Sequence, residues 1–380
     1  MLGLRLSRRR FVGLSIAGLV ATRTVGQARC EEARPVKPKL EDGLAWFDVR
    51  DWGVEGRGWS QTERYFDRLP AKAKGKVRVA VWQLSRHSAG MVVRFETDAT
   101  VIWTRYTLLS NSLAMPHMPA TGVSGVDLYA QDSRGRFRWL AVARPESAPN
   151  VKVRLIDGIE PGRREYMLYL PLYNGVESLE IGLPPQAAMK PLAPRGSRPI
   201  VFYGTSITHG GCASRSGMAY PAILGRRLDR PTINLGFSGN GTMDLEVADL
   251  LGELDAGVYV IDCLPNMNAA AVAERTEPLV RRLRSARPNT PIVLVEDRTF
   301  ANAPLLPAHR RHHAASRAAL KAAFQRLQAA GLEGLVYVEG EHLLGDDGEA
   351  TVDSSHPTDL GMMRMADAME PILRPLAAKQ

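Results

Sequence analysis

The sequence contains little cysteine and lacks long apolar runs. Its 380 residues include three cysteines, Cys30, Cys212 and Cys263. Three cysteines do not make a disulfide framework, and no two of them have the Cys-x-x-Cys spacing of structural zinc or redox sites. Beyond the first 28 residues, no apolar run is long enough to span a membrane. The composition therefore argues against a disulfide-stapled protein, a zinc-ribbon protein and stable membrane insertion.

A concentrated basic patch is also missing. The formal charge is +9, but residues 1–28 carry no acidic residue, and the other cations are dispersed. A nucleic-acid-binding surface requires clustered cations, so no nucleic-acid partner is expected. The content of 45% hydrophobic and 23% charged residues is that of a globular chain, long enough for two domains. The arginines within residues 1–28 are Arg5, Arg8, Arg9, Arg10 and Arg23.

The N-terminal segment has the features of an export signal. Ser-Arg-Arg-Arg-Phe-Val at residues 7–12 precedes a short apolar run, and small residues follow up to Ala28. This pattern resembles a twin-arginine signal removed after Ala28. The run is too short for a membrane anchor, and Cys30 does not follow a lipobox. We therefore expect a signal peptide at residues 1–28, the Tat export machinery as a partner, and a periplasmic or secreted protein.

The hydrophobic pattern divides the mature chain into two parts. After a flexible lead-in at residues 29–43, residues 44–183 show short alternating runs separated by turn residues, which predicts a β-sandwich or jelly roll. The proline-rich segment 184–198 is expected to be a linker. The alternating runs are at residues 77–82, 91–95, 101–106 and 166–170.

In residues 199–380, five short β-rich runs alternate with helical patterns. This rhythm predicts an α/β domain, a three-layer doubly wound parallel sheet with reactive groups at the carboxyl ends of its strands. The expected strands are residues 200–203, 232–235, 258–262, 292–296 and 335–338, and helices are expected at 220–228, 269–286 and 314–330.

Two of the turns after predicted strands carry the residues of a nucleophile and its base. Ser206 lies in Gly-Thr-Ser-Ile-Thr (204–208), directly after the first strand, with a helical pattern starting somewhat later. Alone, this motif is a weak signal, and a serine that caps a helix would be the favoured interpretation. Asp353 precedes His356 by three residues in the turn after the last strand. A carboxylate at that spacing can orient the imidazole while the other ring nitrogen faces a serine.

Two further turns can supply hydrogen-bond donors for a developing oxyanion. The block 234–241 is glycine-rich, so either Gly236 or Gly239 can point a backbone N–H into a cleft. The block 262–268 contains Asn266 and Asn268, and a side-chain amide there can donate to an oxyanion.

This ordered set of serine, glycine, asparagine and histidine blocks, over about residues 197–380, resembles the SGNH hydrolases, also called GDSL-type esterases. Gly-Val-Asp-Leu-Tyr at 125–129 is similar to the GxDLY motif of a β-rich module that precedes some SGNH domains. The resemblance implies Ser206 as nucleophile, His356 as base and Asp353 as its orienting acid. It also implies oxyanion donors at the Gly239 N–H and the Asn266 amide.

The sequence departs from the family pattern in two blocks. Thr205 replaces the aspartate of Gly-Asp-Ser-Leu, which is not a triad member, and the third block reads Leu-Pro-Asn-Met at 264–267. The implied function is an exported serine esterase, without cofactor or metal, that removes short acyl groups such as acetyl from carbohydrate. A lipase or thioesterase is the nearest alternative. A non-catalytic carbohydrate-binding protein on an SGNH scaffold is the alternative of a different class, and the unusual third block favours it.

Several other features are given no role in the chemistry. We interpret His309, His312 and His313 as a solvated helix start, and the acidic segment 346–349 as a turn without calcium. His209 is expected near the pocket without a catalytic role. Cys212 and Cys263 are expected either to pair or to be small buried thiols.

Overall fold

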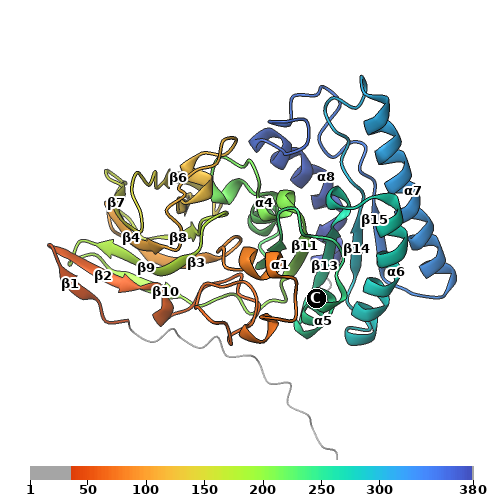
Figure 1. Ribbon diagram of the computed structural model, residues 1–380. Coiled ribbons are helices and arrows are strands. Elements are labelled where there is room, and N and C mark those ends of the chain that lie inside the picture. Colours follow the sequence, from red (N-terminus) through yellow and green to blue (C-terminus); the bar gives the residue numbers. More distant parts are fainter. Residues whose placement is uncertain (1–35, 379–380) are drawn as a thin grey trace, which may run out of the picture. The chain divides into compact units, whose positions relative to one another are not determined.

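The computed structural model describes residues 36–378. The predicted signal at 1–28 and the start of the lead-in lie outside this range. An antiparallel β-rich part comes first along the chain and an α/β part follows (Figure 1). Within residues 36–378, no helix combines the length and apolarity needed to cross a bilayer.

The β-rich part is a sandwich of two five-stranded antiparallel sheets, as predicted. One sheet has the order β1-β2-β9-β4-β7 and the other β10-β3-β8-β5-β6. Alternate side chains of both sheets, including Phe95, Ile102, Leu128 and Ile181, form its core. The strands are β1 (Lys39–Glu41), β2 (Leu44–Asp48), β3 (Val92–Thr97), β4 (Ile102–Leu108), β5 (Asp127–Gln131), β6 (Phe137–Val142), β7 (Asn150–Ile156), β8 (Arg164–Tyr169), β9 (Val176–Leu183) and β10 (Met189–Leu192).

The sandwich extends into both segments that were expected to lack structure. Strand β1 forms within the predicted lead-in and pairs with β2. Strand β10 forms within the predicted linker and pairs with β3 at the edge of the second sheet. Pro191 lies in β10, and an edge strand tolerates proline because one side of the strand needs no partner. Proline content alone therefore does not show which residues of this segment lack secondary structure.

One predicted strand is wrong. Residues 77–82 do not join a sheet; instead Val79–Leu84 form the short helix α1. The alternating valines imitate a strand, yet Val81 is buried against the core of the α/β part while Val79 is 72% exposed. Packing against the second part of the chain therefore overrides local β propensity. Other short helical segments here are η1 (Val49–Asp51), η2 (Ala71–Ala73) and α2 (Ala120–Val123).

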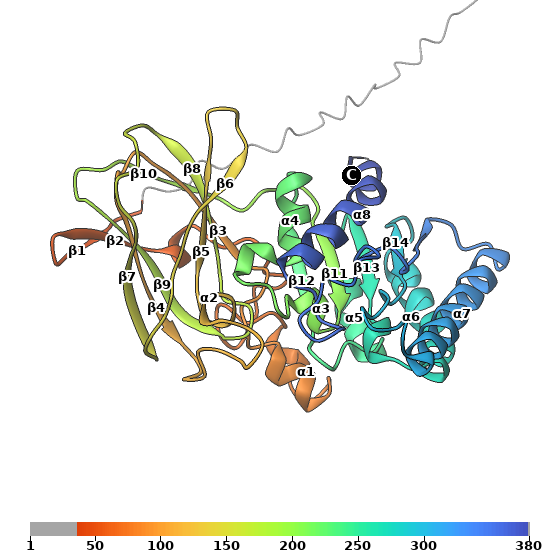
Figure 2. The same ribbon diagram turned by 90° about the horizontal axis from the view of Figure 1, so that it is seen from above.

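The α/β part contains all five predicted strands in one parallel sheet, in the order β12-β11-β13-β14-β15. Helices cover both faces of the sheet, with α4 and α8 on one and α5, α6 and α7 on the other (Figure 2). The strands are β11 (Ile200–Gly204), β12 (Thr232–Gly236), β13 (Val258–Asp262), β14 (Ile292–Val295) and β15 (Leu335–Val338). The helices are α3 (Ser206–His209), η3 (Ser216–Met218), α4 (Tyr220–Arg227), α5 (Leu245–Glu253), η4 (Leu264–Asn266), α6 (Ala269–Ala286), α7 (Pro307–Ala329) and α8 (Asp359–Ala378).

The central strand shows why its sequence is continuously apolar. Ile200 and Phe202 pack with α4 and α8, whereas Val201 and Tyr203 pack with the helices of the other face. Every residue of β11 is buried, because both faces of the parallel sheet are covered.

The β-rich part contributes to both cores of the α/β part. Leu69 and Val81 pack into the core beneath α5 and α6, and Met118 and Leu172 pack into the core beneath α4 and α8. The described residues 36–378 accordingly lie within one compact unit.

The GxDLY segment makes a polar contact between the two parts. The fully buried Asp127 carboxylate accepts hydrogen bonds from the backbone N–H of Gly217 (2.8 Å), from Arg215 Nη1 (3.0 Å) and from Trp139 Nε1 (2.9 Å). At Gly125, a Cβ atom would lie only 2.4 Å from the Ala143 carbonyl oxygen, so a side chain does not fit. The motif therefore holds residues 215–217, which follow α3 closely along the chain.

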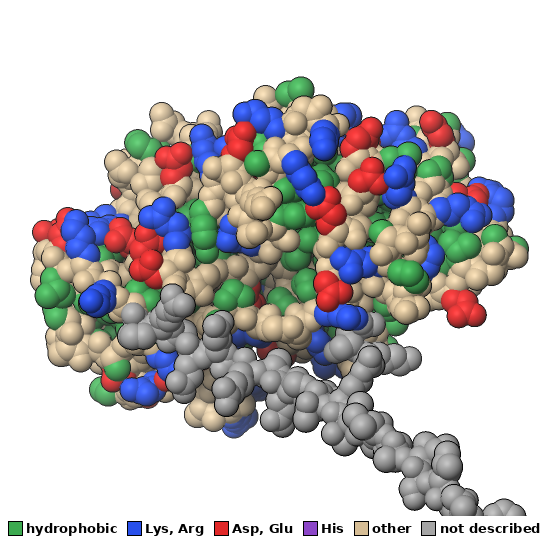
Figure 3. All heavy atoms as spheres, turned by 90° about the horizontal axis from the view of Figure 1, so that it is seen from below, with side chains coloured by type: hydrophobic (Ala, Val, Ile, Leu, Met, Phe, Trp, Pro, Cys, Tyr) green, Lys and Arg blue, Asp and Glu red, His purple; other side chains and the backbone are tan. Residues whose placement is uncertain are grey.

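The surface seen in Figure 3 mixes charges of both signs. On this face, Lys and Arg side chains alternate with Asp and Glu over both parts of the chain. This face therefore lacks the clustered positive charge of a nucleic-acid-binding surface.

Candidate active site

The predicted nucleophile begins a helix at the carboxyl end of the central strand. Strand β11 ends at Gly204, and the single turn α3 starts at Ser206, earlier than the sequence predicts. A four-residue helix is too short to leave a periodic signal, which explains the difference. Thr205, which stands in the place of the usual acid, caps this helix because its Oγ1 accepts from the Ile207 N–H (3.3 Å).

Ser206, His356 and Asp353 come together as a hydrogen-bonded chain. Ser206 Oγ lies 2.9 Å from His356 Nε2, and His356 Nδ1 lies 2.8 Å from Asp353 Oδ2. Ser206, at one end of this hydrogen-bonded chain, is buried (8% exposed), whereas Asp353, at the other end, is exposed. Two stretches of chain that are 150 residues apart thus meet with the spacing that a general base and its nucleophile require.

The surroundings of Asp353 keep its carboxylate charged. Burial alone would favour the neutral acid, but the backbone N–H groups of His356 (2.8 Å) and Ser355 (3.0 Å) and the His356 ring outweigh it. Together they lower the pKa of Asp353 to about 2. An ionised Asp353 accepts a proton-bearing Nδ1, so the Nε2 lone pair of His356 faces the serine hydroxyl.

The glycine-rich turn after β12 distinguishes its two candidate donors. The Gly236 N–H is already used, since it donates to Asn234 Oδ1 at 2.9 Å. Gly239 is exposed, has a φ of +67°, and its N–H finds no acceptor among residues 36–378. Only Gly239 therefore has a donor available for a ligand.

The two asparagines of the third block also differ. The backbone N–H groups of Asn240 (3.0 Å) and Gly241 (3.2 Å) face the Asn266 amide, so its oxygen is oriented toward them and its NH₂ group remains for another acceptor. Asn268 is exposed and caps α6, because its Oδ1 accepts from the Ala271 N–H (2.9 Å). Asn266, and not Asn268, is therefore the asparagine whose side chain lies beside the glycine turn.

Two arginines of the β-rich part, which the sequence analysis missed, hold the same glycine turn. The buried Arg68 donates through Nη1 to the Gly236 carbonyl (2.7 Å) and the Asn234 carbonyl (3.1 Å). Burial lowers the pKa of Arg68 to about 9, so the guanidinium stays charged at neutral pH. Arg78, just before α1, donates to Asn240 Oδ1 (2.6 Å) and to the Asn240 carbonyl (2.8 Å). Sequence offered no signal for either contact because the partners are distant in the chain.

A third missed arginine holds the turn of the predicted triad. The buried Arg298 donates through Nη2 to the Ser355 carbonyl (3.0 Å) and to Ser355 Oγ (2.6 Å), and its Nη1 pairs with Asp297. His313 Nδ1 lies 3.3 Å from Asp297 Oδ2, and His313 is 3% exposed. The interpretation of His313 as part of a solvated helix start is therefore wrong, because a carboxylate distant in sequence accompanies it in space.

His209 is buried rather than at the wall of an open pocket. Its ring stacks on Tyr173 with centroids 4.2 Å apart, and its Nε2 lies 2.7 Å from the Leu172 carbonyl oxygen. Burial lowers the pKa of His209 well below its usual value, and Arg68 lowers it further, so the ring is neutral. Tyr173 in turn donates to the Ser206 carbonyl (3.2 Å), which links the β-rich part to the serine turn.

The two described cysteines do not pair. Cys212 and Cys263 are both free and buried, which agrees with the simpler of the two expectations.

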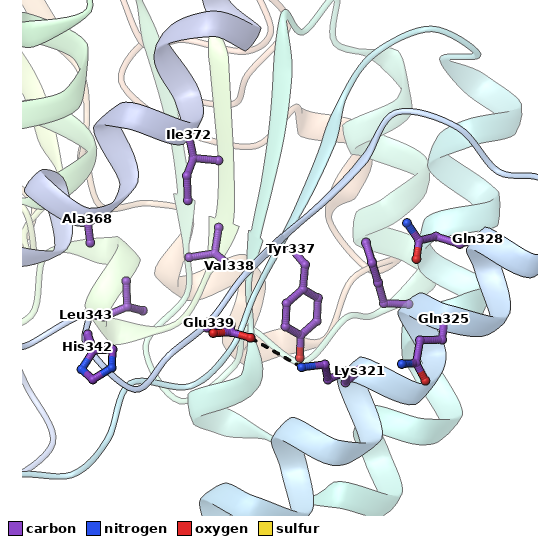
Figure 4. A pocket seen from close by; sticks show the side chains of 11 residues that line it. Lys321, Gln325, Gln328, Tyr337, Val338, Glu339, His342, Leu343, Ala368 and Ile372 are labelled. Carbon is purple, nitrogen blue, oxygen red and sulfur yellow. Dashed lines mark hydrogen bonds and ion pairs between the residues drawn. The ribbon is translucent and has the colours of Figure 1, made fainter.

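A separate hollow of about 520 Å³ lies between α7, β15 and α8 (Figure 4). Lys321 Nζ and Glu339 Oε1 face each other there at 3.5 Å. None of the five predicted site residues lines it, so it is not the place of the predicted chemistry.

A buried carboxyl group lies next to the serine turn. Asp262 Oδ2 accepts from Thr208 Oγ1 (3.0 Å) and from the Tyr220 hydroxyl (2.9 Å). Burial raises the pKa of Asp262 to about 7, and these two donors offset the burial only in part. Asp262 is therefore a group whose protonation changes the stability of the site.

This shift predicts a pH-dependent effect of Asp262→Asn. Between about pH 4 and 7 the unfolded chain releases the proton while the folded protein keeps it, so the wild type loses stability as pH rises. The variant lacks this loss, so its unfolding free energy should rise relative to wild type by roughly 1.4 kcal/mol per pH unit in that window. Urea unfolding at several pH values measures the difference, with Asp249→Asn, at an exposed site on α5, as control. A difference that does not change with pH would contradict the assignment.

Comparisons with known proteins agree with this architecture. Residues 197–374 match the GDSL-like lipase/acylhydrolase family, and residues 44–189 match the GxDLY N-terminus of SGNH-hydrolase-type esterases. None of the curated proteins matches the sequence.

Solved structures extend the likeness over both parts of the chain. A Bacteroides ovatus protein assigned as a GDSL-like lipase is 30% identical with a TM-score of 0.83, covering 88% of this chain and 98% of its own. The salicylyl-acyltransferase SsfX3 of a tetracycline biosynthetic pathway is 18% identical with a TM-score of 0.71, covering 89% and 98%. A family two carbohydrate esterase from Cellvibrio japonicus is 14% identical with a TM-score of 0.58, covering 88% and 98%. This chain therefore belongs to the GDSL-like, or SGNH, lipase/acylhydrolase family and carries the GxDLY module at its N-terminal side.

Proposed function

We propose that this acylhydrolase removes short acyl groups, acetyl above all, from carbohydrate through an acyl intermediate on Ser206. The observation that carries the proposal is the chain of contacts from Ser206 Oγ to His356 Nε2 (2.9 Å) and from His356 Nδ1 to Asp353 (2.8 Å). It unites a nucleophile, a base and an orienting acid.

The proposed first half-reaction makes the acyl-enzyme. His356 Nε2 takes the Ser206 proton as Oγ attacks the ester carbonyl carbon, and the imidazolium is stabilised by the charged Asp353. His356 then gives the proton to the leaving alkoxide, the carbon–oxygen bond of the ester breaks, and an alcohol departs. In the second half-reaction water replaces the alcohol, attacks the acyl carbon with His356 again as base, and the acid leaves as Ser206 recovers its proton.

Three donors are available for the oxyanion of each tetrahedral intermediate. The Ser206 N–H is at the first position of α3, where no intrahelical acceptor exists. The Gly239 N–H is unpaired among the described residues, and the Asn266 NH₂ group is left over once its oxygen accepts from the glycine turn. Donors that are positioned before reaction stabilise negative charge without reorganisation. These assignments extend the proposal to Gly239 and Asn266 as catalytic residues.

The choice of a carbohydrate ester is supported by two indirect observations. The twin-arginine-like segment points to the periplasm or the exterior, where glycan polymers are found. The fold is shared with a family two carbohydrate esterase. We therefore propose the Tat machinery as export partner and an acylated glycan as substrate. Lipase or thioesterase activity on other acyl chains is the competing specificity.

The substrate proposal is tested with p-nitrophenyl acetate, butyrate and laurate alongside acetylated xylan. We expect acetate release from xylan. The rate of p-nitrophenyl ester hydrolysis should fall from acetate to laurate, because the proposed substrate carries a short acyl group. A preference for laurate would support a lipase and contradict the short-acyl assignment. Failure to hydrolyse any of these esters would favour the non-catalytic carbohydrate-binding protein.

Substitution of the two asparagines separates the oxyanion role from helix capping. Asn266→Ala should lower kcat by about a hundredfold or more, since a preorganised donor is lost. Asn268→Ala is the matched control, and it should cost roughly 1 kcal/mol of stability through loss of the α6 cap while kcat stays near wild type. Steady-state kinetics and urea unfolding of both variants give the comparison. A larger loss of kcat in Asn268→Ala would transfer the donor role to that residue.

A further inference from the structure

Three side chains with metal-binding atoms converge beside the imidazole of His356. One ligand atom each from His117, Cys212 and His356 lie within 4.8 Å of one another. In residues 36–378 this is the single place where three such side chains (His, Cys, Asp or Glu) meet this closely. Two imidazoles and a thiol are the ligand types that zinc prefers.

His117 is held above the site by a tight turn of the β-rich part. Met115 and Met118 close this turn with reciprocal backbone hydrogen bonds of 2.9 and 3.1 Å. Met118 is 1% exposed and packs into the core beneath α4 and α8, so the turn is anchored to the α/β part. The His117 ring is exposed and meets the His356 ring edge-on, with centroids 5.8 Å apart. The backbone is thus held firmly while the ring itself can rotate.

Cys212 is held in an unusual backbone conformation close to the same histidine. Its φ is +69°, in the left-handed region that residues with a side chain seldom adopt. Burial, together with the nearby charge of Asp353, raises the pKa of Cys212 to about 12. The group is therefore a thiol at neutral pH, and a thiophilic cation would have to displace its proton.

His356 already has the tautomer that a metal ligand needs. Its Nδ1–H donates to Asp353, which directs the Nε2 lone pair away from the carboxylate. Zinc-binding histidines commonly have the same carboxylate partner on the nitrogen opposite the metal. The interaction that prepares His356 as a base thus also prepares it as a ligand.

We propose that a zinc ion binds between His117, the Cys212 thiolate and His356 Nε2, and reversibly blocks the enzyme. Water would complete the tetrahedral coordination, and the Cys212 proton would leave to solvent. Ligand atoms around tetrahedral zinc stand about 3.3–3.8 Å apart, so the group must contract by roughly 1 Å, which rotation of the exposed His117 ring allows. The Ser206 hydroxyl loses its hydrogen bond to Nε2, so no base remains to activate it. The inhibitory effect rests on the proposed function, whereas the binding does not.

Binding is tested with Co²⁺, a spectroscopic substitute for zinc, on protein first treated with EDTA. We expect a thiolate-to-cobalt absorption band in wild type that is lost in Cys212→Ser and weakened in His117→Gln. His342→Gln, at an exposed histidine beside the hollow of Figure 4, is the matched control and should retain the band. A band that persists in Cys212→Ser, or no band in wild type, overturns the site.

Inhibition is measured separately as hydrolysis of p-nitrophenyl acetate against Zn²⁺ concentration. Wild type should be inhibited and should recover with EDTA. Cys212→Ser and His117→Gln should hydrolyse normally without zinc, while their half-inhibiting Zn²⁺ concentration rises at least about tenfold, because one of three ligands is lost. Equal inhibition of wild type and both variants would show that zinc acts elsewhere. The cobalt spectrum without any hydrolysis would support the metal site and reject only the esterase.

Discussion

The hydrogen bond between Ser206 and His356 is the contact on which the arrangement of the site depends. It spans 2.9 Å and joins the central strand β11 to the turn after β15. In the sheet, β13 and β14 lie between these strands, a separation of roughly 14 Å at the usual strand spacing. The turn that carries His356 must therefore return across the sheet edge and be held there. Arg298 holds it at Ser355, and the Ala301 N–H donates to the Ser354 carbonyl (2.9 Å).

The β-rich part supports the other side of the site. Arg68 and Arg78 hold the glycine turn, Tyr173 contacts the serine turn, and Asp127 holds residues 215–217. Leu69 and Met118 are embedded in the two cores of the α/β part. A buried cation that binds carbonyl groups, as Arg68 does, fixes a backbone more rigidly than apolar contact alone, because each lost bond leaves a charge unsatisfied. Through these contacts the β-rich module positions the turn that contains Gly239.

The sequence was informative where a pattern is local or repeated. The β-sandwich class and all five parallel strands could be predicted, because periodicity reports burial directly. The edge strands β1 and β10 could not, since they lie in segments whose composition is that of a lead-in and a linker. The helix at residues 79–84 could not, since its single buried face packs on a distant core. The Arg298–Asp297–His313 contacts could not be predicted either, because they join different elements and no motif of fixed spacing in the sequence marks them. Ordered blocks at strand ends made Ser206, Asp353 and His356 candidates, and the family resemblance already favoured Gly239 and Asn266. Only the structure shows which of the competing groups are hydrogen-bonded elsewhere, as the Gly236 N–H and the Asn268 side chain are.

The proposed chemistry requires that the imidazole of His356 activates the hydroxyl of Ser206. A fluorophosphonate probe tests it most directly, because the probe forms a covalent bond only with an activated serine, whatever the natural substrate. We expect stoichiometric labelling of the folded protein at Ser206, located by peptide mass spectrometry, with labelling abolished in Ser206→Ala and strongly slowed in His356→Gln. Absence of label on folded wild-type protein, or label on another residue, would contradict it.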